Sequence, residues 1–144
     1  MRARMFALAL MLGLLCTTGT AQQQALKLRI TDTSGASVEI TNVALDYSDY
    51  PSGFGFYTPV HERQGIRIKQ GSGHVTVRWT DIAVLTLQAQ TVGRTFTITG
   101  DVQLVSGTTS KVEVLPVSKD VTGKTELGDY FVSLRNIREI RPVR

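Results

Sequence analysis

The stretch GHVTVRWTDIAVL, residues 73–85, decides the fold, because GDYFVSLRNIREI repeats its pattern at residues 128–140. In both stretches apolar residues first alternate with polar ones and then fall three positions apart. Alternation is typical of a half-buried β-strand, and a three-residue spacing fits one 3₁₀ turn. The pattern therefore predicts strand, short turn and strand, twice in one chain. The matched positions are Val75, Val77, Trp79, Ile82 and Leu85 in the first stretch and Tyr130, Val132, Leu134, Ile137 and Ile140 in the second.

A second pattern recurs with a different spacing. Residues 28–43 resemble residues 102–117, which lie 74 positions later, whereas the first two stretches lie 55 positions apart. The difference of 19 residues (74 − 55) indicates an insertion in the first copy. We therefore predict an internally duplicated β module, with one copy in residues 22–90 and the other in residues 91–144. The shared positions are Leu28, Ile30, Val38, Glu39, Ile40 and Val43 in the earlier stretch and Val102, Leu104, Val112, Glu113, Val114 and Val117 in the later one.

The rest of the chain also alternates with a period of two, and glycine-rich turns separate the short apolar runs. This pattern favours an all-β protein made of antiparallel strands with one buried face. The order of strand, single turn and strand resembles that of small SH3-like and Sm-like barrels, where such a turn precedes the last strand. We expect either two small barrels of this kind or one β-sandwich.

The N-terminus has the features of an export signal. Arg2 and Arg4 precede an apolar run at residues 6–16, and Gly19-Thr20-Ala21 provides small residues for cleavage. The run has 11 residues, too few for the ~20 that span a bilayer. We therefore predict a signal helix within residues 1–21, its removal, and a periplasmic or extracellular protein with no transmembrane span.

Signal removal also changes what chemistry the protein can carry. The only cysteine is Cys16, so the mature chain has no disulfide and no thiol nucleophile. The formal charge of +4 includes Arg2 and Arg4, and every Asp and Glu lies after residue 21, so the mature chain carries about +2. This weak charge argues against nucleic acid as a partner, since nucleic-acid binding needs a concentrated basic face.

The insertion is the first candidate site. It falls within residues 46–64, DYSDYPSGFGFYTPVHERQ, which hold half of the aromatic residues of the chain. Aromatic side chains on a long loop suit a protein or carbohydrate partner, because they offer a large contact area at low entropic cost. The alternative is an extra hairpin with Phe54 and Phe56 in the core. The candidate contact residues are Tyr47, Tyr50, Phe54, Phe56, Tyr57 and His61.

Few side chains in the sequence are candidates for metal binding or catalysis. His61 and His74 are the only histidines, and neither lies in a spaced set of metal ligands, so we expect no metal and no cofactor. Ser72, His74 and Asp81 contain the residue types of a catalytic triad, but no nucleophile elbow surrounds Ser72. The arginine-rich tail, residues 135–144, is interpreted as a final edge strand or as a basic strip facing an anionic partner.

These observations favour an exported, non-enzymatic β protein that acts as a binding or assembly module of the cell envelope. One alternative is a small hydrolase-like enzyme that uses His61 or His74 with nearby carboxylates. Another is a structural subunit that pairs through its sheet edges.

Overall fold

The described part of the chain is built almost entirely of β-strands, as the alternation predicts. The computed structural model describes residues 25–49, 58–115 and 118–144, so the predicted signal segment lies outside the described residues. The strands of the described part are β1 (Lys27–Asp32), β2 (Ser37–Asp49), β3 (Thr58–Glu62), β4 (Gly65–Gln70), β5 (Gly73–Arg78), β6 (Ile82–Val92), β7 (Thr95–Leu104), β8 (Thr109–Glu113), β9 (Ser118–Thr125), β10 (Gly128–Ser133) and β11 (Ile137–Val143).

The predicted turn between strands is confirmed at both places. A 3₁₀ turn, η1 (Trp79–Asp81), joins β5 to β6, and a second, η2 (Leu134–Asn136), joins β10 to β11. The residue before each turn has nearly the same backbone angles, φ −68° and ψ 140° at Arg78 and φ −68° and ψ 135° at Ser133. The two stretches therefore share local geometry as well as sequence pattern.

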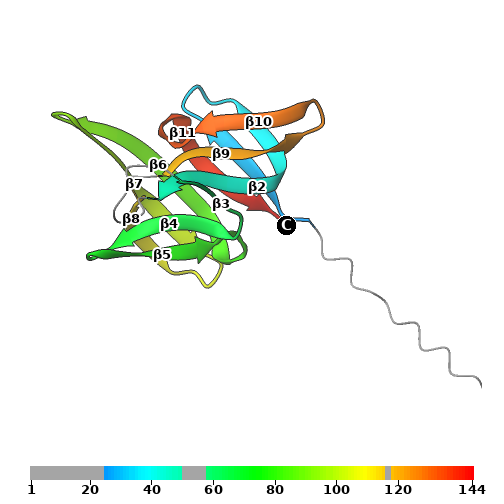
Figure 1. Cartoon of the computed structure of the whole chain (residues 1–144). Coiled ribbons are helices and arrows are strands. Elements are labelled where there is room, and N and C mark those ends of the chain that lie inside the picture. The colour runs from blue at the N-terminus through cyan, green and yellow to red at the C-terminus, as the bar shows by residue number, and fades with distance from the viewer. Residues whose placement is uncertain (1–24, 50–57, 116–117) are drawn as a thin grey trace, which may run out of the picture.

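The strands form one large open sheet and one hairpin. The nine-stranded sheet has the order β10-β9-β2-β1-β11-β6-β7-β8, with β3 paired to β2, and β4 and β5 form a separate two-stranded sheet. All described pairings are antiparallel. The prediction of two closed barrels is therefore wrong, because a single sheet runs through both halves of the sequence (Figure 1).

The two predicted modules interleave within this sheet. Early strand β1 pairs with β11, the last strand, and early strand β2 pairs with β9. Strands β4 to β8 instead adjoin one another, because the β4–β5 hairpin contacts the segment just after β8. Ile68 of β4 forms a β-bridge with Val114, and the carbonyl of Arg67 accepts a hydrogen bond from the N–H of Leu115 (3.0 Å). We call β1, β2, β9, β10 and β11 unit I, and β4 to β8 unit II. The two units lie on opposite sides of the molecule in Figure 1.

The units present the same strand order on either side of a central pairing. Outward from the centre, unit I has β11, β1, β2, β9 and β10, and unit II has β6, β7, β8, β4 and β5. Leu85 of β6 faces Ile140 of β11, and these two residues occupy matched positions of the repeated stretches. The register shift between Thr31 and Asp32 in the β1–β11 pair also has a counterpart in the β6–β7 pair, between Ile82 and Val84.

The β1–β2 hairpin of unit I and the β7–β8 hairpin of unit II match at a spacing of 72 residues, so the predicted spacing of 74 is wrong. Gly35 (φ 92°) and Gly107 (φ 94°) occupy the same position of the same turn. Gly35 donates to the carbonyl of Asp32 (3.1 Å), and Gly107 donates to that of Leu104 (2.9 Å). A shift of two keeps every side chain on its face. Apolar alternation therefore fits both spacings, and only the turns distinguish them.

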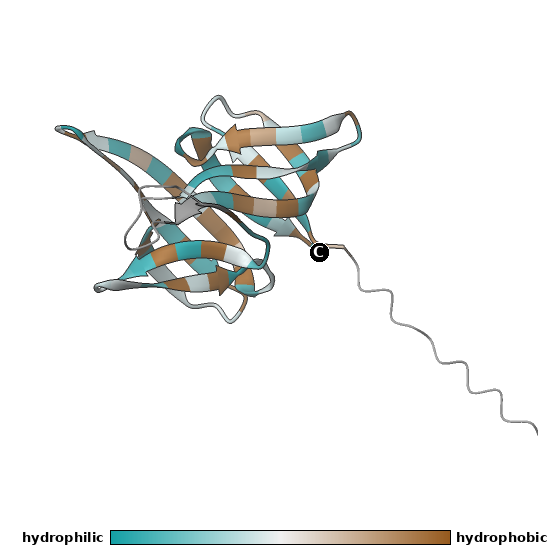
Figure 2. Ribbon diagram, in the orientation of Figure 1, coloured by the Kyte–Doolittle hydropathy of each residue, from teal (hydrophilic) through white to brown (hydrophobic). Residues whose placement is uncertain are grey.

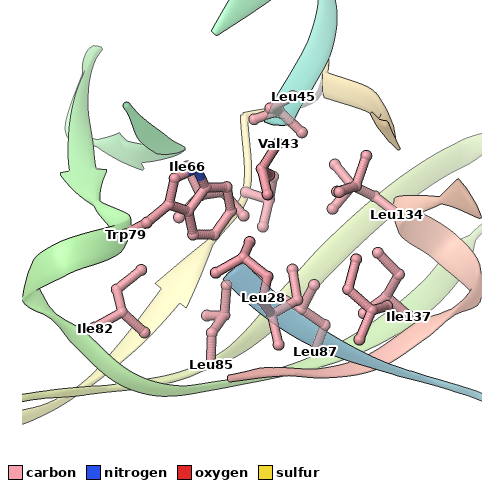
Figure 3. Packing of buried hydrophobic residues seen from close by; sticks show 14 of the residues in the cluster. Leu28, Val43, Leu45, Ile66, Trp79, Ile82, Leu85, Leu87, Leu134 and Ile137 are labelled. Atoms are coloured by element: carbon pink, nitrogen blue, oxygen red, sulfur yellow. The ribbon is translucent and has the colours of Figure 1, made fainter. Parts of the chain in front are cut away.

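A single apolar core joins the two units. Figure 2 shows hydrophobic and hydrophilic positions alternating along the strands, and Figure 3 shows the inward side chains meeting. The repeated pattern also predicts that all ten matched positions are buried, and this is wrong at four of them. Val75 is 38% exposed, and Val77, Tyr130 and Val132 are only partly buried. The fully or almost fully buried side chains are Leu28, Ile30, Ile40, Leu45, Ile66, Trp79, Ile82, Leu85, Val121, Leu134, Ile137 and Ile140.

The arginine-rich tail is not an edge strand. β11 lies between β1 and β6, near the middle of the large sheet. Pro142 is tolerated there because it faces Leu28 of β1 and lies beyond the short β6 pairing, which covers only Glu139 and Ile140. Arg141 is compensated by Glu139 (Nε–Oε1 3.3 Å). A continuous basic strip is therefore interrupted along β11.

Candidate functional site

The described part of the insertion is a hairpin arm. β2 continues past the end of β1 to Asp49 and pairs there with β3, with Asp46 opposite His61. The flanking strands pair as the extra-hairpin alternative expects, and its placement of Phe54 and Phe56 in the core falls outside the described residues. The candidate residues Tyr50, Phe54, Phe56 and Tyr57 lie outside the described residues.

Tyr47 is not an exposed contact residue, contrary to its place among the predicted contacts. Its side chain is only 4% exposed. The guanidinium carbon of Arg67 lies 4.0 Å from the centroid of its ring, in a cation–π arrangement. Tyr47 falls on the inward face of β2 as it passes β4, so it packs inside the arm.

His61 is the one exposed member of the predicted contact set among the described residues. Its Nδ1 lies 2.5 Å from Oδ1 of Asp46, and its side chain is 60% exposed. The neighbouring carboxylate of Glu62 accepts a hydrogen bond from the backbone N–H of Gln64 (2.8 Å). A histidine hydrogen-bonded to a carboxylate is one component of acid–base catalysis, and exposed pairs of this kind are also common on surfaces without any catalytic role.

The residues Ser72, His74 and Asp81 do not come together. Ser72 lies in the turn before β5, and Asp81 lies in η1 beyond its other end. The intervening strand of six residues separates them by roughly 20 Å, at about 3.3 Å per residue. Asp81 is instead paired with Arg78 (2.9 Å). No catalytic triad forms from this set.

A surface that the sequence reasoning missed lies on β10. Strand β10 is the last strand of the large sheet, and β9 is its only partner among the described strands. Phe131 is 71% exposed and Leu127, in the turn before β10, is 101% exposed. We call residues 127–133 the β10 edge. Large exposed apolar side chains on a free strand are unusual, because such edges pair with other chains.

Unit II provides an internal comparison for this edge. The β9–β10 hairpin and the β4–β5 hairpin have the same register 55 residues apart, with Gly128 opposite Thr125 and Gly73 opposite Gln70. At that spacing Ser72 corresponds to Leu127 and Thr76 corresponds to Phe131. The same hairpin therefore forms with polar residues at both positions. This mismatch within the repeated stretches is the signal that sequence reasoning had available.

Two open hollows flank the β10 edge. One, of about 570 Å³, is lined by residues that include Lys27, Glu39 and Leu127. The other, of about 380 Å³, is lined by residues that include Arg63 and Phe131. Both hollows are bordered by the β9 strand that supports the edge. An exposed apolar side chain thus stands beside each hollow.

The charges around these hollows are mixed. Lys124, which lines both hollows, pairs with Asp129 (3.1 Å), and Lys27 pairs with Glu39 (3.4 Å). Hydrogen bonds from Arg29 and then Lys27 hold the pKa of Glu39 below its ordinary value. Positive and negative groups alternate, so this surface suits a protein segment better than a polyanion.

The described residues hold no cluster of metal-ligating side chains. Residues 25–49, 58–115 and 118–144 contain no group of three or more His, Cys, Asp or Glu side chains placed to hold a metal ion. No helix within those ranges has the length and apolarity to cross a membrane. Comparison with protein families, curated proteins and solved structures returned no match to this chain.

Proposed function

We propose that the chain is an exported, non-enzymatic binding or assembly module of the cell envelope, and that the β10 edge is its contact surface. The exposure of Leu127 and Phe131 on a strand with a free side carries this proposal. Burying one such side chain in a complex contributes about 1.5–3 kcal/mol. A sheet edge adds backbone hydrogen bonds to that gain, as in other cases of strand addition.

The fold itself gives no reason for these two side chains. Ser72 and Thr76 occupy the corresponding positions of the β4–β5 hairpin, and that hairpin forms without apolar side chains there. Exposed phenylalanine and leucine contribute little to the stability of the isolated chain, since they remain in water. Their presence on one edge and absence from the other therefore supports a contact made by β10 alone.

The test is capture of envelope proteins by cross-linking with the purified chain. A double variant, Leu127→Ser with Phe131→Thr, carries the residues found at the same positions of β5. Capture should fall at least tenfold, while the melting temperature stays within a few degrees. Val92→Ser with Val105→Ser removes two other exposed apolar side chains and is the matched control. Equal capture by the wild type and the β10 variant would refute the proposal.

We also propose that the aromatic segment of the arm is a second contact. Tyr50, Phe54 and Tyr57 lie in the sequence between β2 and β3, which pair beyond the end of β1. Aromatic side chains suit a contact because they can bury a large apolar area. Replacing all three by serine should reduce capture of a protein or carbohydrate partner and leave the melting temperature within a few degrees. A collapse of the melting temperature would show that these rings belong to the core.

We infer, in addition, that units I and II derive from one duplicated module. The matched strand order, the two 3₁₀ turns and the paired register shifts support this origin. The test exchanges residues 73–81 with residues 128–136 while Trp79 and Leu134 keep their places. An equivalent pair of segments should give a chimera with the wild-type circular dichroism spectrum and one unfolding transition. An unfolded chimera would refute the equivalence.

The hydrolase alternative has one supporting observation, the His61–Asp46 pair. Among the described residues no hydroxyl nucleophile is hydrogen-bonded to that imidazole. An ester-hydrolysis assay on wild type and His61→Ala decides it: turnover that the variant lacks would favour the enzyme over the binding module.

A further inference from the structure

We propose that the partner of the β10 edge is a second copy of this chain, with the two β10 strands pairing antiparallel about a twofold axis and Phe131 facing Phe131 of the second copy. This inference rests on the proposed function, since it names the partner of the same edge. It makes the protein a symmetric dimer whose large sheet continues from one copy into the other.

The backbone of β10 is free to make this pairing. Hydrogen-bonded pairs alternate along an antiparallel ladder, so every second residue of β10 directs its N–H and C=O away from β9. Natural edge strands are usually protected by lysine, proline or a bulge. The sequence of β10, GDYFVS, has neither lysine nor proline, and its pairing with β9 has no register shift.

The other sheet ends are better protected. β8 carries Lys111 and is followed at once by the bridge from Val114 to Ile68. β5 carries exposed His74 and Arg78. β10 carries one charged side chain, Asp129, which is paired with Lys124 of β9. It alone of these three strands has an exposed phenylalanine, so it is the least protected edge among them. Its exposed residue of greatest apolar area, Phe131, lies near the middle of the strand, where a twofold axis brings the two copies closest.

The side chains select one register. With Phe131 opposite Phe131 of the second copy, Asp129 falls opposite Ser133 of that copy, because opposite positions of an antiparallel pair run in reverse order. Aromatic side chains paired across strands stabilise a sheet. A slip that set the two Asp129 carboxylates opposite each other would bring like charges together and is disfavoured. Tyr130 and Val132 remain packed on the core in either register.

The chain already contains an antiparallel pairing of this symmetry. β6 and β11 correspond to each other in the repeated stretches, and they pair with Leu85 opposite its counterpart Ile140. Corresponding strands of this module thus join edge to edge in an arrangement of approximate twofold symmetry. A β10–β10 pairing repeats that geometry between molecules. Because one six-residue strand gives a small interface, the dimer should be concentration-dependent.

The first experiment measures mass by sedimentation across a concentration series, using the chain without residues 1–21, none of which is a described part of either sheet. The wild type should pass from one to two chain masses. Leu127→Ser with Phe131→Thr should stay monomeric at concentrations at least tenfold higher, and the control Val92→Ser with Val105→Ser should dimerise like wild type.

The second experiment tests the register by disulfide formation. Cys16 is absent from the shortened chain, so Asp129→Cys and Ser133→Cys each introduce a single thiol and leave Phe131 in place. A mixture of the two variants should form a covalent dimer under mild oxidation, because these positions lie opposite each other in the proposed register. Either variant alone is the matched control and should give at least tenfold less. Equal cross-linking of the mixture and of the single variants would overturn the β10 pairing.

The outcomes separate this inference from the proposed function. A wild type that stays monomeric at every concentration overturns self-pairing. If that monomer still captures an envelope protein through Leu127 and Phe131, the proposed function stands with a different partner. Open-ended oligomers that grow beyond two copies would also overturn the inference, because a twofold pairing closes at two.

Discussion

Replacement of Trp79 by alanine should lower the free energy of unfolding by about 3–5 kcal/mol. The side chain has no exposed surface and projects among the inward residues of both units (Figure 3). Its removal loses the transfer free energy of the largest core side chain and leaves a cavity that rigid strands fill poorly. Leu134 has the matched position in unit I and is almost fully buried. Leu134→Ala should cost about 2–5 kcal/mol, in proportion to its smaller size.

A conservative variant separates packing from polarity at the same site. The indole Nε1 of Trp79 is buried and has no hydrogen-bond partner among the residues that the structure describes. An unpaired buried donor costs about 1–3 kcal/mol, so Trp79→Phe removes a penalty together with part of the packing. We expect Trp79→Phe to cost under about 1.5 kcal/mol. Trp79→Ala also removes the penalty of the unpaired indole N–H, but it loses the whole ring. Its larger cost is then due to lost packing alone.

Urea unfolding followed by far-ultraviolet circular dichroism measures these differences, since tryptophan fluorescence disappears in the Trp79 variants. The unfolding midpoint should fall while the dependence on urea concentration stays constant, as expected for a change in stability alone. A cost under about 1 kcal/mol for Trp79→Ala would contradict full burial. A phenylalanine variant as unstable as the alanine variant would contradict the account of the unpaired indole.

Three further predictions test the fold. Gly100→Ala should cost at least about 2 kcal/mol in urea unfolding, because an added methyl would collide with the backbone carbonyl of Thr86. The pKa of Asp32 is lowered chiefly by the Ser34 hydroxyl, so its stabilisation is complete above the ordinary value of 3.8 and is lost as pH falls through the lower folded value. Asp32→Asn should therefore flatten the acid side of the stability profile, and an unchanged profile would refute this. Both units should unfold in one transition by circular dichroism and calorimetry, and two separated transitions would show that the units are independent.

The sequence was sufficient to predict the strands and the two 3₁₀ turns, because alternation and three-residue spacing are local signals. It was insufficient to predict which strands pair. Lys27 meets Val143 across 116 positions (143 − 27), and no local pattern specifies that meeting. The predicted spacing between the β1–β2 and β7–β8 hairpins differs from the observed one by two residues for a related reason. A shift of two leaves a pattern with a period of two unchanged.

The candidate contacts were only partly predictable. Tyr47 borders an aromatic stretch of sequence, which predicts exposure, yet on β2 it packs beneath Arg67. Phe131 stands between Tyr130 and Val132, whose alternation indicates an inward strand face and gives no sign of the outward residue between them. Comparing the outward positions of the two repeated stretches would have found it, since Thr76 is polar and Phe131 is not.

The topology also explains why an apolar edge is acceptable on β10. In unit I the strands β9, β2, β1 and β11 each have a described strand on both sides, whereas β10 has β9 alone. A change at the outer side of β10 therefore disturbs one pairing at most, while a change in β1 or β11 disturbs the junction of both units. Stability constrains the inner strands and leaves the outer side of β10 free to vary. Exposed Leu127 and Phe131 at such a position are accordingly better explained by a contact with another chain than by folding.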